Sequence, residues 1–291
     1  MDFGRYQRAA VKTLRGVEDE QDPVMVPLLG LVGEVGSVAT AYKKRLRDGA
    51  GFQLGKQRIR EELGDVLWYV ATLADNFELD LEDVAAASLE KAKDRWRTSE
   101  EDRVLLDESA PESEQLPRLA RFTFTPTVRP TDGRTVVALT RDGVPVGDPL
   151  TDASRIDDDY RYHDAFHLAY VAVLGWSPVM RSLLRCKRKS SSQLDEAEDG
   201  GRAIVIEEGV SALVFSYASR HGFFEDVQQV DYELLQTISN MVSHLEVSGV
   251  RSADWEKAIM IGYGCWRELR ERDGGTVEID MRKRTMRLVE L

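Results

Sequence analysis

The sequence predicts a mainly α-helical protein, built from two helical parts with a small β-strand insert between them. Apolar residues recur at three- and four-residue intervals through most of the first hundred residues and again after about residue 158, which is typical of helices that bury one face. Between these parts, RFTFTPTV and TVVALTRDGVPVG alternate apolar and polar residues beside Asp-Gly turns, which is typical of short strands. These observations divide the chain into residues 1–100, 101–156 and 157–291.

Four helices are predicted in the N-terminal part. The stretch FGRYQRAAVKTL is amphipathic, and Asp48-Gly49 provides an end for the apolar second helix. Because the connections between these helices are short, we expect them to pack as an antiparallel bundle. The predicted ranges are 3–14, 26–46, 56–76 and 81–96.

The rest of the chain begins with an acidic segment, RTSEEDRVLLDESAPESEQLPR, which is predicted to be a linker or a mobile segment. Two or three short strands follow it, and the final GGTVEIDMRKRTMRLVEL predicts a hairpin. Between the strands and the hairpin, the apolar pattern predicts a second helical bundle. Its helices cover about 159–174, 177–188, 200–221, 229–246 and 252–272.

The composition indicates a soluble globular protein of roughly two domains. The chain has 291 residues, of which 42% are hydrophobic and 31% are charged. No apolar run approaches the roughly 20 residues that a membrane span needs, and MDFGRYQRAA lacks the apolar core of a signal peptide. We therefore expect a cytoplasmic protein with no membrane partner. Its two cysteines, Cys186 and Cys265, are expected to be free buried thiols.

The net charge of −12 narrows the choice of partners. A general nucleic-acid binder needs a basic face for the phosphate backbone, so no nucleic-acid partner is expected. A small phosphorylated ligand is not excluded, because a bound divalent cation inverts the local charge.

Carboxylates gather beside the most apolar stretch of the third predicted helix, REELGDVLWYV. Glu62 and Asp65 are three residues apart and Glu61 and Asp65 four apart, so they share a helix face. An antiparallel neighbour would bring Glu34, on the second helix, close to them. Carboxylates that face one another repel unless a cation compensates them, and Mg²⁺ is a hard ion that prefers oxygen ligands. This arrangement predicts a magnesium site, for which Mn²⁺ is an alternative.

Other residues near these acids fit both a phosphate site and a simpler structure. Lys43 and Lys44 follow Glu34 by two to three turns and are placed to meet phosphates. Glycines 33 and 36 flank Glu34 and are expected to permit close approach of backbone or ligand. The simpler alternative is a solvated acidic face, paired with Arg58 and Arg60.

Five blocks resemble the MazG-like family of all-α nucleoside triphosphate pyrophosphohydrolases over residues 3–97. They are YQRAAVKT, LLGLVGEVGSV, AYKKRLRDG, EELGDVLWYVATLADNFELDLEDVA and LEKAKDRW. The resemblance implies a four-helix fold in a dimer or higher homo-oligomer. It also implies hydrolysis of NTPs or dNTPs to the monophosphate and pyrophosphate, with Mg²⁺ bound by an ExxE…ExxD motif.

By this resemblance, the metal would be held by Glu34, Glu62 and Asp65, and it would polarise phosphate oxygens and activate a bound water. Glu61, at the position of a frequent extra acid, or Glu34 would orient that water. The resemblance also implies that basic residues contact phosphates, namely Lys44, Lys91 and Arg95.

One position departs from the family motif. Ser37 stands where the motif has its second glutamate, and a serine hydroxyl is a weak, neutral ligand. Two interpretations follow: a pyrophosphohydrolase in which Glu61 compensates, or a non-catalytic nucleotide-sensing or oligomerisation module with a degenerate site.

The C-terminal half contains a second set of candidate ligands. His163, Asp164 and His167 lie on one predicted helix, and histidines four residues apart can bind a metal together. The stretch VIEEGVSALVFSYASR also aligns without gaps on IREELGDVLWYVATLA, which places Glu207 and Glu208 on the acidic pair of the third helix.

The alignment predicts either an internal duplication or a chance similarity between two buried helices. A duplication would make Asp164, His167, Glu207 and Glu208 a second site, which could be the competent one if the first has decayed. The alternative is that the histidines form hydrogen bonds within the bundle.

Overall fold

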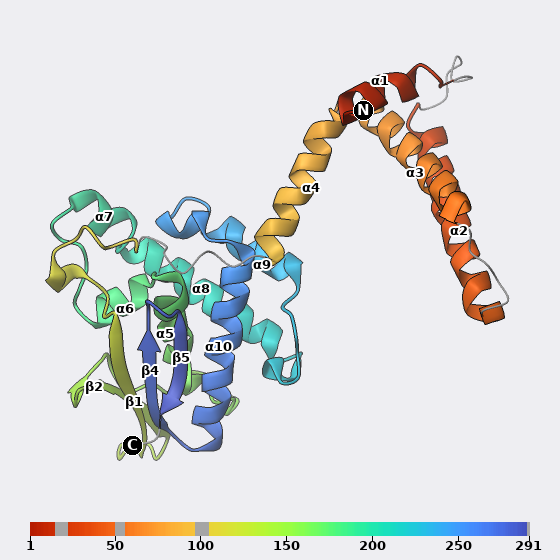
Figure 1. Ribbon diagram of the computed structural model, residues 1–291. Helices are drawn as coiled ribbons and strands as arrows, with labels where there is room; N and C mark the ends of the chain where they lie inside the picture. The colour runs from red at the N-terminus through yellow and green to blue at the C-terminus, as the bar shows by residue number, and fades with distance from the viewer. Residues whose placement is uncertain (15–22, 50–55, 97–104, 290–291) are drawn as a thin grey trace. The chain divides into compact units, whose positions relative to one another are not determined.

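The computed structural model describes residues 1–14, 23–49, 56–96 and 105–289, which form two compact units, Met1–Lys93 and Asp94–Leu291 (Figure 1). The fold is mainly α-helical, as predicted. The α-helices are α1 (Phe3–Val11), α2 (Met25–Asp48), α3 (Lys56–Asn76), α4 (Leu81–Trp96), α5 (Asp164–Leu174), α6 (Pro178–Leu183), α7 (Ser192–Ala197), α8 (Gly201–Ala218), α9 (Tyr232–Met241) and α10 (Ser252–Glu271). The strands are β1 (Leu119–Val128), β2 (Thr135–Arg141), β3 (Val144–Pro145), β4 (Gly275–Asp280) and β5 (Thr285–Val289).

In the N-terminal unit, α2 and α3 pack side by side as an antiparallel hairpin (Figure 1). Two contacts fix how the helices align. The Nδ2 atom of Asn76, at the end of α3, donates to the carbonyl of Pro23, just before α2, at 2.9 Å. Seven residues along α2 from Pro23, Gly30 lies against the ring of Tyr69, which is seven residues back along α3. From this end of the hairpin, each residue of α2 is therefore level with the residue of α3 that lies the same number of positions away.

The close approach of α2 to α3 depends on Gly30. A Cβ atom at this position would lie 2.3 Å from the Tyr69 ring, so alanine forces the ring to move. We expect Gly30→Ala to lower the free energy of unfolding of this unit by roughly 1–3 kcal/mol, in the range of overpacked cores. Denaturation by urea, followed by far-UV circular dichroism, measures the change.

Gly33 provides the matched control for this variant. A Cβ at Gly33 or Gly36 meets no described atom within 4 Å, so these two glycines leave open space rather than a close backbone contact. Gly33→Ala should stabilise α2 by about 0.5–1 kcal/mol, because alanine loses less backbone entropy in a helix than glycine does. Equal stability of the two variants would contradict the packing of Gly30 on Tyr69.

Helix α1 is attached to the rest of the unit by a buried polar side chain as well as by apolar packing. Gln7 donates from Nε2 to the carbonyl of Leu79 and accepts from the backbone N–H of Leu81, both at 2.9 Å, so it links α1 to the α3–α4 turn. Trp68 on α3 donates to the Thr13 hydroxyl at 2.8 Å. Among the described residues, the hydrophobic core of this unit is small, with Ala10, Ala71, Ala74 and Leu81 buried in it.

Many apolar side chains of the N-terminal unit remain exposed. The expectation that no segment suits a membrane span is wrong for Met25–Asp48, which is long and apolar enough by length and composition. One such helix is weak grounds for a span, since core helices of soluble proteins and signal sequences can have the same length and composition. Within α4, which the structure describes in full, Leu81 is the one buried residue. The exposed apolar residues of α2 and α3 include Leu28, Leu29, Val32, Val35, Leu46, Leu63 and Leu67.

The C-terminal unit contains one antiparallel sheet, in the order β3-β2-β1-β4-β5. β1 pairs with β2 on one side and with β4 on the other, for example Arg121 opposite Glu278. The strands expected as an insert and the predicted terminal hairpin thus belong to the same sheet. The region expected to be a second helical bundle packs on this sheet.

The core of this unit lies between the sheet and its helices. Along β1, buried Phe122 and Phe124 alternate with exposed Arg121 and half-buried Thr123, so one face of the sheet is apolar. Helices α5 and α10 pack on each other and on β5, and every residue of α5 is buried. This burial fixes the N-terminus of α5 and the histidines there. The two free cysteines are buried, as predicted.

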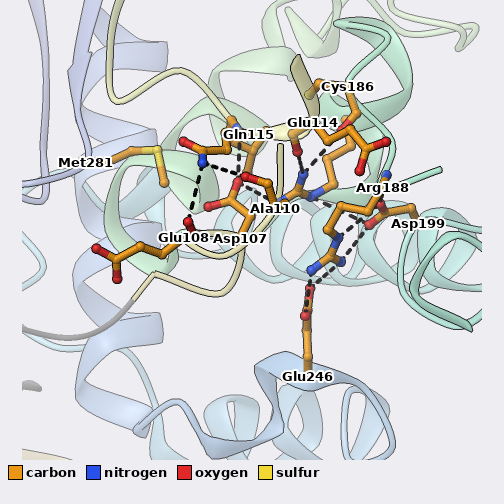
Figure 2. A network of polar contacts seen from close by, with 12 residues as sticks. Asp107, Glu108, Ala110, Glu114, Gln115, Cys186, Arg188, Asp199, Glu246 and Met281 are labelled. Carbon is orange, nitrogen blue, oxygen red and sulfur yellow. Dashed lines mark hydrogen bonds and ion pairs between the residues drawn. The ribbon is translucent and has the colours of Figure 1, made fainter. Parts of the chain in front are cut away.

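A buried ion-pair network joins distant segments of the C-terminal unit (Figure 2). The Arg188 guanidinium donates to both carboxylates beside it, at 2.7 Å to Asp199 and at 2.6 and 2.8 Å to Glu246. Arg181 donates to Asp107 at 2.7 Å and lies 3.5 Å from Asp199. These arginines and aspartates are almost completely buried.

The network also orders part of the acidic segment that was expected to be a linker. Residues 97–104 lie outside the described residues, but Asp107 is buried and accepts the Leu116 N–H at 2.8 Å. Burial favours the neutral acid, yet this hydrogen bond together with Arg181 and Arg118 outweighs burial and lowers the pKa of Asp107. The carboxylate is thus ionised and paired.

Candidate functional site

The helical hairpin brings the predicted acids of α2 and α3 to the same level. Glu34 is one turn beyond Gly30 on the same face of α2, and Asp65 is one turn before Tyr69 on the same face of α3. Since Gly30 contacts Tyr69, Glu34 and Asp65 stand opposite each other along the seam between the helices. Glu34 is half-buried there and Asp65 is exposed.

The next turn repeats this pairing with the unusual serine. Ser37 is seven residues beyond Gly30 and Glu62 seven residues before Tyr69, so the two share a level and a face. Both are half-buried. The position that departs from the motif therefore lies opposite a predicted metal ligand, where a second carboxylate would be most useful.

Two of the acids of α3 contact neighbouring side chains of the same helix. The Arg58 Nε atom lies 3.5 Å from Glu62, and Gln57 donates to exposed Glu61 at 2.8 Å. In the part of the chain that the structure describes, three donor atoms of His, Cys, Asp or Glu come within 4.8 Å of one another only in the C-terminal unit. Glu34, Glu62 and Asp65 do not converge to that degree, which is the expected result for like charges without a cation.

The predicted phosphate-binding residues are spread over the chain. Lys43 and Lys44 are exposed near the C-terminal end of α2, and Lys91 is exposed on α4. Arg95, in contrast, belongs to the C-terminal unit, where its guanidinium stacks 5.0 Å from the centre of the Tyr232 ring. The structure therefore places Arg95 against an aromatic ring of the C-terminal unit.

One residue near the acids was missed by the sequence analysis. Burial and, after it, the charge of Asp65 raise the pKa of Tyr6 on α1. The Tyr6 hydroxyl is thus close enough to interact electrostatically with the Asp65 carboxylate, and it can donate a hydrogen bond. Only its place in the amphipathic first helix pointed to it, because no local pattern links α1 to Asp65.

The C-terminal unit contains the tightest cluster of metal-type ligands. His163 lies immediately before α5 and His167 one turn into it, while Glu208 comes from α8. The Glu208 Oε2 atom lies 3.6 Å from Nε2 of His167 and 4.0 Å from Nε2 of His163. The two imidazoles meet edge to face, with ring centres 5.6 Å apart. Here the structure brings together the histidine pair and one of the predicted acids.

Glu207 occupies a different place from its neighbour. Its carboxylate is completely buried and accepts from Nδ1 of His167 at 2.8 Å, from the Ser177 hydroxyl at 2.6 Å and from the Val179 N–H at 2.7 Å. Ser177 precedes Pro178 and begins α6 as its cap, which leaves the Val179 N–H, the first in α6, to donate to this carboxylate. Glu207 therefore orients His167 and lies behind it. Ser177 and Val179 were not found from the sequence.

The ionisable groups of this cluster influence one another. Burial opposes charge on His167, but Glu207 and Glu208 outweigh burial and raise the pKa of His167 to about 10. Burial lowers the pKa of His163, despite its acidic neighbours. Burial also raises the pKa of Asp164, which interacts with both histidines and with Glu208. Asp164 is thus a buried acid whose charge interacts with the cluster.

The aligned acidic pairs of α3 and α8 have different surroundings. Both stretches are helical, as the alignment requires. On α3, however, the pair is solvated or half-buried, whereas Glu207 on α8 is sealed in the core. The partner of Asp65 in the alignment, Ser211, is buried. The duplication stays a prediction.

Comparison with known proteins shows which family this chain resembles. Residues 26–98 match the MazG nucleotide pyrophosphohydrolase domain, and residues 101–291 match the MazG C-terminal domain. The Gene 37 protein of Mycobacterium phage L5 is 44% identical over 69 residues, which are 23% of this chain and 60% of that protein. The chain thus spans about 60% of the length of this relative. No solved structure matches. Because the two family models follow each other along the chain and one of them covers well over half of it, the chain belongs to the MazG-like family.

Proposed function

We propose that this protein hydrolyses nucleoside triphosphates, NTPs or dNTPs, with water to give the nucleoside monophosphate and pyrophosphate. The observation that carries the proposal is the match of residues 26–98 to a nucleotide pyrophosphohydrolase domain. The alignment of α2 and α3 supports it, because Glu34 stands level with Asp65 on facing sides of the hairpin.

The donor chemistry of this seam suits a hard divalent cation. Glu34, Glu62 and Asp65 offer carboxylate oxygens only, and none of them is fully buried, so an ion that keeps part of its water shell has access. We propose that these three residues hold Mg²⁺, which Mn²⁺ can replace. When bound, the ion would neutralise charge on the phosphate oxygens and lower the pKa of a bound water.

Side chains of the N-terminal unit would position the attacking water and the phosphates. Glu61 is exposed and held by Gln57, and we propose that it accepts a proton from the attacking water and orients that water toward the α-phosphorus. Glu34 is the other candidate for this role. Lys43 and Lys44, beyond Glu34 on α2, would bind the outer phosphates as point charges. Lys91 and Arg95 are included in the proposal on the resemblance alone.

A second copy of the chain is the proposed partner of the N-terminal unit. The part of its core that the structure describes is small, and exposed leucines and valines cover α2 and α3. An apolar surface of this kind is typical of an interface between subunits. We therefore propose a homodimer or higher homo-oligomer that acts in the cytoplasm.

Ser37 favours a second candidate function. It lies opposite Glu62, and a hydroxyl there supplies no negative charge to the metal. A site with one carboxylate fewer would still bind a nucleotide with its cation but turn it over poorly. The alternative is thus a non-catalytic nucleotide-sensing or oligomerisation module.

A panel of the common NTPs and dNTPs, assayed for pyrophosphate with Mg²⁺ or Mn²⁺, distinguishes the two functions. The proposed enzyme should release pyrophosphate and monophosphate in equal amounts from at least one nucleotide, and excess chelator should stop the release. Nucleotide binding that needs metal, without pyrophosphate from any member of the panel, would instead establish the sensing module.

A further inference from the structure

We propose that His163, His167 and Glu208 form a second metal site, specific for a divalent transition metal such as Zn²⁺. The site lies in the C-terminal unit and uses none of the acids of the α2–α3 hairpin. It is independent of the proposed pyrophosphohydrolase activity, and its ligands differ from a magnesium site in kind, because two of the three are imidazole nitrogens.

The distances among the three donor atoms fit a bound ion better than direct contacts. Oε2 of Glu208 is 3.6 Å from His167 Nε2 and 4.0 Å from His163 Nε2, beyond normal hydrogen-bond length. Two ligands bound tetrahedrally at zinc distances stand roughly 3.4 Å apart. All three donor atoms lie within 4.8 Å of one another, so small side-chain rotations would complete the coordination.

The other ring nitrogen of each histidine is already engaged. Nδ1 of His163 lies 2.9 Å from the Tyr160 carbonyl, which only accepts, so this nitrogen carries the proton. Nδ1 of His167 donates to Glu207 at 2.8 Å. Each Nε2 is thereby the ring nitrogen left for a metal, which on His167 would displace the proton that Glu207 and Glu208 favour when no ion is bound; this is the arrangement found where a carboxylate or carbonyl orients a metal-binding imidazole.

An independent observation favours a ligand over an ordinary buried histidine. His167 is completely buried, and its Nε2 atom has no hydrogen-bond partner among the described residues. An unsatisfied buried nitrogen is destabilising, and native proteins rarely keep one without a reason. Glu207 accepts three hydrogen bonds, which hold it in place as a support for the metal ligand His167.

The ligand types select the metal class, and the exposure shows how an ion would enter. Two nitrogens and one carboxylate suit Zn²⁺ and its first-row neighbours, whereas Mg²⁺ prefers oxygen alone. The Glu208 side chain is 41% exposed, so the site opens to solvent on that side. Three protein ligands leave a fourth position for water or an oxygen of another molecule, as in zinc sites that do chemistry.

Metal titration of the full chain tests the proposal. To silence the hairpin site, the host protein carries Glu62→Gln and Asp65→Asn. Zn²⁺ binding is followed by calorimetry and Co²⁺ binding by visible absorption, with excess Mg²⁺ present throughout. We expect one equivalent of each transition metal to bind, with ligand-field bands for Co²⁺, and Mg²⁺ not to displace it.

Two ligand variants decide the assignment. Glu208→Gln and His163→Ala should each weaken Zn²⁺ binding by at least about 10–100-fold, the range seen even for residues that merely support a ligand. The controls are His221→Ala and Glu233→Gln, at two exposed positions of the same unit. Glu208 is partly exposed, so its variant is expected to fold. Absence of Zn²⁺ and Co²⁺ binding, or equal affinity in ligand and control variants, would overturn the proposal.

Discussion

Replacing Glu62 by glutamine is expected to lower the rate of pyrophosphate release by at least about 100-fold, the usual effect of removing one charged group from a preorganised site. Glu62 faces Ser37 across the α2–α3 seam, so α2 offers no carboxylate at that level to take over its charge. Glutamine keeps the size of the side chain and removes the negative charge alone. Initial rates at saturating nucleotide and Mg²⁺ measure the effect.

Glu90→Gln is the matched control for this prediction. Glu90 is 71% exposed on α4 and pairs only with Lys93 at the surface, so the same chemical change there should leave the rate within about twofold. Circular dichroism should show equal helix content in both variants, since neither side chain belongs to the core. Full activity in Glu62→Gln would exclude the hairpin as the catalytic site and would direct attention to Glu207 and Glu208 on α8.

The local sequence was sufficient to predict most of the helices. The range predicted for the third helix, 56–76, is that of α3, and the predicted start of the fourth at Leu81 is that of α4. Such segments have strong apolar periodicity and clear ends, which are local properties. The helix predicted at 159–174 begins later, at Asp164, because a short 3₁₀ turn at 160–162 precedes it.

The single sheet could not be predicted in the same way. Each strand was recognised locally, but the pairing of Arg121 with Glu278 joins residues more than 150 positions apart. The alternation within a strand identifies a buried face and does not identify a partner strand. The buried network around Asp107 was missed for a related reason, since an acidic stretch with Pro and Ser is typical of a solvated linker.

In the candidate sites too, local features could be predicted and features that depend on tertiary packing could not. The i, i+3 and i, i+4 spacings of the acids and histidines are local, so Glu62, Asp65, His163 and His167 could be recognised as candidates. The different roles of Glu207 and Glu208 could not, because adjacent residues of α8 point to different surroundings. Glu207 meets Ser177 and Val179, whose positions depend on how α6 packs on α8.

Replacing Arg188 by methionine is expected to lower the free energy of unfolding of the C-terminal unit by about 3–5 kcal/mol, the typical effect of removing one partner from a buried ion pair. Methionine fills much of the volume but leaves the carboxylates of Asp199 and Glu246 without their shared guanidinium. Asp199 and Arg188 are both almost wholly buried, so water cannot replace the lost partner. Urea denaturation, followed by the fluorescence of the buried tryptophans 176, 255 and 266, measures the loss.

The next residue supplies the control. Lys189 is 69% exposed and pairs with Asp195, so Lys189→Met should change the stability by less than about 1 kcal/mol. Adding Asp199→Asn to Arg188→Met should recover part of the loss, because a neutral amide replaces a buried charge that has lost its closest partner and keeps only Arg181, at 3.5 Å. If lost packing rather than charge is responsible, the double variant will be no more stable than Arg188→Met. A loss in Arg188→Met no larger than in Lys189→Met would show that Asp199 and Glu246 do not depend on Arg188 in the folded protein.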